Sequence, residues 1–141
     1  MLKSVLPLLL CGCVLLVDGP AVGEDEPKVD CENPVTQSDM NFCSGKDYEE
    51  ADAALNAQWV LTRKAMADWD RELEGQQPGP GAEKALLKAQ RAWINYRDGQ
   101  CEAEGFAVRG GSMEPMVVSG CMAELTRKRT EELKAMANGV E

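Results

Sequence analysis

A run of 29 residues without glycine or proline, Lys46–Glu74, constrains this chain more than any other feature. Alanine, leucine, glutamate, lysine and arginine dominate the run, and these residues have the highest helix propensities. At about 100° per residue its apolar members fall on one face, which predicts a long amphipathic helix. That face carries Tyr48, Leu55, Trp59, Thr62, Met66, Trp69 and Leu73.

Turn signals bound this run on both sides. Before it, Thr36 and Asp39 have the spacing of a capping box, which predicts a short helix over Thr36–Cys43 that ends at Gly45. After it, the sequence "GQQPGPG", Gly75–Gly81, is a strong helix breaker.

Two more helices are predicted beyond the breaker. One runs from Ala82 to at least Cys101, and to Val108 at its longest, with a core stripe of Leu86, Leu87, Gln90, Trp93, Ile94, Arg97 and Cys101. "RGGS", Arg109–Ser112, is a turn, and Ser112 can cap the last helix because Pro115 is tolerated in a first turn. The last helix carries Val118, Met122, Leu125, Arg129, Leu133 and Met136 on one face, and 138–141 should fray. The predicted class is all-α, an antiparallel bundle of one short helix and three longer ones.

The chain begins like an exported protein. Residues 1–23 have a lysine near the start, the apolar run "VLPLLLCGCVLLV" and small residues before Glu24, which predicts a signal peptide cut near Gly23. The alternative is a lipoprotein with Cys13 as the lipidated residue. Either would place the protein in the periplasm or outside the cell. We expect residues 24–30 to be a flexible acidic lead, and 31–137 to form one helical domain with no stable membrane span.

Four cysteines remain after the predicted cut: Cys31, Cys43, Cys101 and Cys121. An even number in an exported chain indicates two disulfides. Residues equidistant from the 109–112 turn face each other in a helical hairpin, which favours Cys101–Cys121 and leaves Cys31–Cys43. The alternative, a site with four cysteine ligands to a metal, is disfavoured because the chain has no C-x-x-C pair and no histidine.

Charge and composition narrow the function. The net charge of −9 argues against binding nucleic acid, whose phosphates attract lysine and arginine. Without histidine there is no Ser-His or Cys-His nucleophile, and no pair among the many carboxylates stands out, so we expect neither an enzyme nor a cofactor. Met113 and Met116 have a spacing that could hold Cu(I), but an apolar contact is the expected role of these thioethers.

Polar side chains interrupt the predicted core stripes. Asp52, Asn56, Gln90 and Arg97 are expected to form an interior polar network that fixes helix register, or else a small-ligand site between the helices. A buried arginine needs a carboxylate, and Asp52 is the first choice for Arg97, ahead of Asp39 and Asp47. Asp52 and Arg97 lie at unequal heights from the 75–81 turn, so their pairing requires a staggered hairpin.

The same stripes include the three tryptophans. Trp59, Trp69 and Trp93 are expected in the core. Tyr48 and Tyr96 could lend their hydroxyls to the polar network.

Three segments resemble one protein family. "CENPVTQSDMNFCSGKDYEEADAALNAQW", "LLKAQRAWINYRDGQCE" and "GGSMEPMVVSGCMAELTRKRTEEL" are similar to the LprI-type lysozyme inhibitors, which are small exported bacterial helical domains. The resemblance spans about Cys31–Met136. It implies an inhibitor that binds a cell-wall hydrolase and shields the wall.

The resemblance and the charge together indicate a binding loop. Animal-type lysozymes are basic and hold two carboxylates in their cleft, so an acidic inhibitor would be steered towards them. The 109–114 loop, with Arg109, Ser112, Met113 and Glu114, is our candidate contact surface, because Cys101–Cys121 would brace it. The alternatives are an ordinary helix connection here, and an envelope-stress or periplasmic interaction module without lysozyme inhibition. The sequence does not indicate an oligomeric state.

Overall fold

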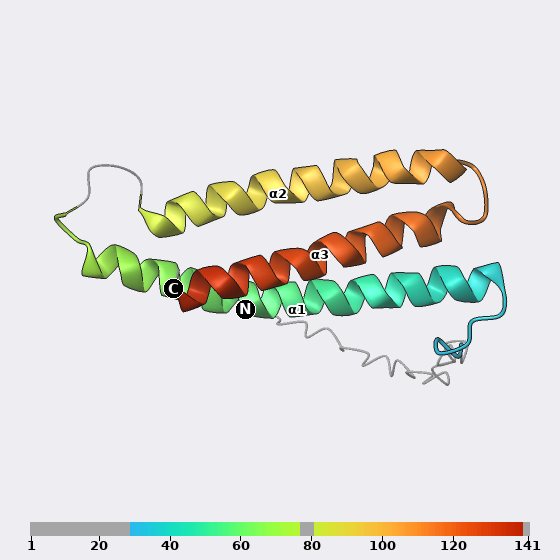
Figure 1. Cartoon of the computed structure of the whole chain (residues 1–141), viewed down its shortest axis with the longest axis horizontal. Coiled ribbons are helices and arrows are strands. Elements are labelled where there is room, and N and C mark those ends of the chain that lie inside the picture. Colours follow the sequence, from blue (N-terminus) through green and yellow to red (C-terminus); the bar gives the residue numbers. More distant parts are fainter. Residues whose placement is uncertain (1–28, 77–80, 140–141) are drawn as a thin grey trace, which may run out of the picture.

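The computed structural model describes residues 29–76 and 81–139, and within these ranges it contains three long helices and no strand. Helix α1 spans Gln37–Glu72, α2 spans Ala82–Gly105 and α3 spans Glu114–Asn138. A single 3₁₀ turn, η1, occupies Phe106–Val108. Helices α1 and α3 run in the same direction and α2 runs opposite to them (Figure 1). Helix α3 packs most extensively on α1. The predicted all-α class is therefore confirmed. The predicted signal peptide and most of the acidic lead lie outside the described residues.

Helix α1 begins as predicted but is not interrupted. The Asp39 amide donates to the Thr36 hydroxyl at 3.1 Å, and the Thr36 amide donates to the Asp39 carboxylate at 3.0 Å. The predicted break at Gly45 is wrong: the short helix and the long one are a single 36-residue element. A glycine inside a helix costs only about 1 kcal/mol, which the packing of the flanking turns offsets.

The end of α1 holds the start of α2. The Asp70 carboxylate accepts the amide hydrogens of Ala82 at 2.5 Å and Glu83 at 3.1 Å, so it caps the next helix. Arg63 forms an ion pair with Glu83 across the same hairpin. Gly81 occupies the N-cap position of α2 and has no side chain to cap it, so Asp70 of α1 supplies the cap instead. These contacts set the angle between α1 and α2.

An apolar core fills the half of the bundle that lies next to this hairpin. Leu55, Met66, Leu86 and Leu133 are buried there, and Trp59 and Trp93 pack against them. The Thr62 hydroxyl, fully buried, lies 2.9 Å from the Leu133 carbonyl oxygen and donates to it. Four members of the predicted stripes lie nearer the surface instead, because three helices cover only part of each other's circumference. They are Trp69 at 38%, Leu73 at 42%, Leu87 at 38% and Ile94 at 38% exposure.

Candidate functional site

Both predicted disulfides are present at the opposite end of the bundle. Cys31 and Cys43 are joined with Cα atoms 5.4 Å apart, and Cys101 and Cys121 with Cα atoms 5.5 Å apart. The second bridge lies directly behind the connection between α2 and α3. A Cβ on Gly105 would come within 2.6 Å of a Val118 methyl group, so the two helices approach closely just before the chain turns.

Hydrogen bonds from two of its own backbone amides hold the connection between α2 and α3 in shape. Gly110 has a φ of +76°, which favours glycine, and its amide donates to the Glu114 carboxylate at 2.6 Å. The Gly111 amide donates to the Val108 carbonyl at 3.0 Å. Ser112 is not the cap that its sequence position predicts. Helix α3 begins at Glu114, with Met113 in the cap position and Pro115 in the first turn.

Helix α1 fastens the connection from the side. The Asn41 side-chain amide donates to the Ser112 carbonyl at 2.9 Å, and the Ser44 hydroxyl donates to the Met116 carbonyl at 2.9 Å. The Gln37 amide in turn donates to the Asn41 side-chain oxygen at 3.0 Å. The backbone of the connection is therefore fixed by residues about 70 positions earlier, near the Cys31–Cys43 bridge.

Three large side chains project from this fixed backbone. Phe106 is 55% exposed and Met113 is 43% exposed. The Arg109 guanidinium carbon lies 4.2 Å from the centre of the Phe106 ring, which is a cation–π contact. A shallow hollow of about 410 Å³ runs between them, lined by residues of the 106–113 segment. We call this surface, Phe106, Arg109, Ser112 and Met113, the loop face.

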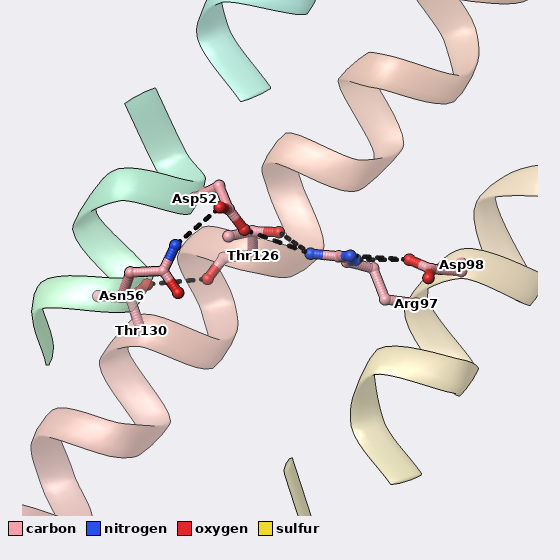
Figure 2. Close-up of polar contacts among 6 residues, drawn as sticks. All are labelled: Asp52, Asn56, Arg97, Asp98, Thr126 and Thr130. Atoms are coloured by element: carbon pink, nitrogen blue, oxygen red, sulfur yellow. Dashed lines mark hydrogen bonds and ion pairs between the residues drawn. The ribbon is translucent and has the colours of Figure 1, made fainter. Parts of the chain in front are cut away.

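Arg97 is buried and sits among the partners predicted for it. Its side chain is 9% exposed, and it contacts Asp52 at 3.7 Å and Asp98 at 2.8 Å (Figure 2). Its Nη1 also donates to the Thr126 hydroxyl at 3.4 Å. Asn56 donates to Asp52 at 2.8 Å, but from an exposed position. The other carboxylates considered for Arg97 are used elsewhere, Asp39 in the α1 cap and Asp47 in an ion pair with Arg127.

Gln90 does not join this network. Its side-chain oxygen accepts from Nε of Arg129 at 3.0 Å, and Arg129 pairs with Glu132 at 2.9 Å. Arg129 is 8% exposed, and its Nη2 has no hydrogen-bond partner among the described residues. The four predicted network residues therefore divide into two clusters, and they do not enclose one common ligand site.

Arginine stacking joins the two clusters. The Arg97 and Arg129 guanidinium carbons lie 5.1 Å and 6.0 Å from the Trp93 ring centre. The Arg97 guanidinium carbon also lies 5.4 Å from the centre of the Tyr48 ring. Burial raises the pKa of the Tyr48 hydroxyl above its ordinary value. The prediction that Tyr96 joins the network is wrong, because this residue is 57% exposed.

Sequence reasoning placed Arg129 on a helix face without assigning it to the polar network, and it did not single out Asn41 and Ser44. Asn41 and Ser44 follow Gln37 at spacings of four and three residues, and the same spacing leads on to Tyr48. This stripe would have marked them as facing the interior of the bundle, although not which helix they contact, if the helix had been expected to continue through Gly45.

Within 29–76 and 81–139 there is no group of three histidine, cysteine or acidic side chains placed to hold a metal. The Met116 thioether accepts from the Gln37 amide at 3.8 Å. No helix in these ranges is long and apolar enough to cross a membrane.

The fold and site define a small helical domain, braced by two disulfides, with a fixed loop face at one end. The chain belongs to the lysozyme inhibitor LprI family, whose model matches residues 31–133. It is also similar to an uncharacterized protein of Rhizobium meliloti (strain 1021), with 53% identity over 137 residues that cover 96% of this chain and 94% of that protein. No solved structure matches the chain.

Proposed function

We propose that this protein inhibits a lysozyme-type cell-wall hydrolase by binding it through the loop face. The observation that carries the proposal is the Arg109 guanidinium stacked 4.2 Å from the exposed Phe106 ring, on a backbone fixed by a disulfide and by α1. Arginine, aromatic residues and methionine are enriched at protein interfaces relative to the rest of the surface. Because the backbone is already ordered, docking would lose little conformational entropy.

The chemistry of the partner fits this surface. A lysozyme cleft holds two carboxylates, and a guanidinium donates hydrogen bonds to a carboxylate in pairs. Met113 and Phe106 flank Arg109 and would cover the apolar walls of such a cleft. The net charge of −9 would bring a basic hydrolase to the inhibitor faster at low salt than at physiological salt.

The disulfides support a place of action outside the cytoplasm. Both bridges form between cysteines that follow the predicted signal peptide, and such bridges persist in oxidising compartments. We propose on this basis that the protein acts in the periplasm or outside the cell, after cleavage near Gly23.

Inhibition assays on surface variants test the proposal. The purified, oxidised protein is mixed with a basic animal-type lysozyme, and lysis of cell-wall substrate is followed at low and at physiological salt. We expect inhibition at micromolar protein. Arg109→Ala should weaken it by roughly tenfold or more, which corresponds to about 1.4 kcal/mol of binding free energy.

Arg91→Ala is the matched control, since it removes the same charge from an exposed position on α2. It should leave the inhibition constant nearly unchanged. Absence of inhibition by the native protein would exclude the proposal for this class of lysozyme. Equal effects of the two variants would place the binding surface away from Arg109.

A further inference from the structure

The face of α1 that points away from the core is a continuous stripe at helical spacing. At about 100° per residue, it lies nearly opposite the buried positions Leu55, Thr62 and Met66. Its members are Lys46, Glu50, Ala53, Ala54, Ala57, Val60, Leu61, Lys64 and Asp68. We call this the outer stripe.

The centre of the outer stripe is apolar and largely uncovered. Val60 is 65% exposed and Leu61 is 60% exposed, among the highest values for large apolar side chains in the described chain. Ala53, Ala54 and Ala57 beside them are exposed as well. Alanines let a second helix come close, so Val60 and Leu61 could be covered by a helix lying along the stripe.

Charges flank this centre in a symmetrical order. Glu50 and Lys64 each lie seven residues from Ala57, with opposite signs. Lys46 and Asp68 each lie eleven residues from it, again with opposite signs. The apolar residues obey the same symmetry, since Ala53 and Ala54 are as far from Ala57 as Leu61 and Val60 are. The stripe is thus complementary to an inverted copy of itself.

We propose that two copies of this chain associate through their outer stripes, with α1 antiparallel to α1 and a two-fold axis at Ala57. Glu50 of each chain then faces Lys64 of the other, and each pair of alanines covers Val60 and Leu61 of the other chain. A two-fold interface requires such self-complementarity. A surface selected only for solubility has no such requirement.

The contacts within one chain are compatible with this arrangement. Lys64 already contacts its own Asp68 at 2.7 Å, with 75% of its side chain exposed, so its ammonium group can lie between that carboxylate and the second copy's Glu50. The paired segment, residues 46–68, is about 33 Å long. One helix pair of this length buries a small interface, so we expect a weak dimer that forms only at high protein concentration.

Charge exchange within one chain tests this geometry. Sedimentation equilibrium of the purified, oxidised protein, over about 1–500 µM, should show a mass that rises from one chain to two. Glu50→Lys should keep the mass at one chain, because lysine then faces lysine at both ends. Lys64→Glu should do the same. Glu50→Lys combined with Lys64→Glu should restore the dimer, since the two positions are too far apart within one helix to compensate each other.

A second pair of variants separates this face from other surfaces. Leu61→Glu should abolish association, whereas Tyr96→Glu, on α2 at a similar 57% exposure, should leave it intact. Circular dichroism confirms that each variant is folded. A native protein that stays at one chain throughout would overturn the proposal. A dimer that the double charge exchange does not restore would overturn it equally, as would one that Tyr96→Glu dissolves.

Discussion

At the residue scale, two arginines are buried by stacking rather than by enclosed ion pairs. Arg97 and Arg129 each expose 9% of the side chain and flank Trp93. Their carboxylate partners remain half in water, with side-chain exposures of 40% for Asp52 and 46% for Glu132. Such pairs contribute little net stability, since removing a guanidinium from water costs about as much as the pairing returns. We propose that their main effect is to hold the three helices in one register.

Arg129 provides the sharper test of this view. Its buried Nη2 has no partner among the described residues, and the Gln90 side-chain oxygen accepts a hydrogen bond from its Nε. Arg129→Met combined with Gln90→Leu removes both polar groups while keeping their volume. We expect the double variant to be as stable as the native protein, or more stable by about 1–2 kcal/mol. Urea unfolding measures this, and a loss above about 2 kcal/mol would show that the pair stabilises the fold.

The same residues show the reach of sequence reasoning. The contact between Arg97 and Asp52 was predictable, because each interrupts an apolar stripe and a buried charge requires an opposite one. The bond between Gln90 and Arg129 was not. It depends on how α2 and α3 dock, and a stripe on one helix does not specify its neighbour across the interface.

At the element scale, glycines inside helices do two different things. Gly45 and Gly99 lie in α1 and α2, and nothing would come within 4 Å of a Cβ on either. Gly45 misled the prediction of a helix end, because glycine marks helix ends only when tertiary contacts do not carry the helix onward. Gly105, by contrast, allows α2 and α3 to approach.

Alanine substitutions separate these two roles within one helix. Gly99→Ala should raise the free energy of unfolding by about 0.5–1 kcal/mol, since it only improves helix propensity. Gly105→Ala should lower it by about 1–3 kcal/mol, because the new methyl group overlaps Val118. Thermal unfolding of the two variants gives both values. Equal shifts would mean that α2 and α3 separate at no cost.

At the scale of the whole molecule, the class and the disulfides were predictable, while the support of the loop face was not. The 109–112 turn lies midway between Cys101 and Cys121, so the pairing followed from a hairpin alone. The loop face depends on contacts between residues separated by 71 and 72 positions, Asn41 with Ser112 and Ser44 with Met116. No local pattern specifies contacts of that range.

Removing one of these contacts should loosen the loop face selectively. Asn41→Ala deletes the donor to the Ser112 carbonyl, a bond worth about 1 kcal/mol. Amide hydrogen exchange across residues 110–113 should then speed up roughly fivefold, while exchange in the core helices stays unchanged. Asn56→Ala is the control, because Asn56 donates only to the half-exposed Asp52. Unchanged exchange in Asn41→Ala would show that the turn holds itself.

The two ends of the bundle are held by different interactions, so we expect their local stabilities to differ. Both disulfides and the close approach at Gly105 lie at the loop end, whereas the apolar core lies towards the hairpin end. Heat should weaken the hairpin end first, and reduction should weaken the loop end first. We therefore expect a reductant that opens Cys101–Cys121 to loosen the loop face while the core helices stay folded, so that the proposed binding activity would depend on the redox state of the surroundings.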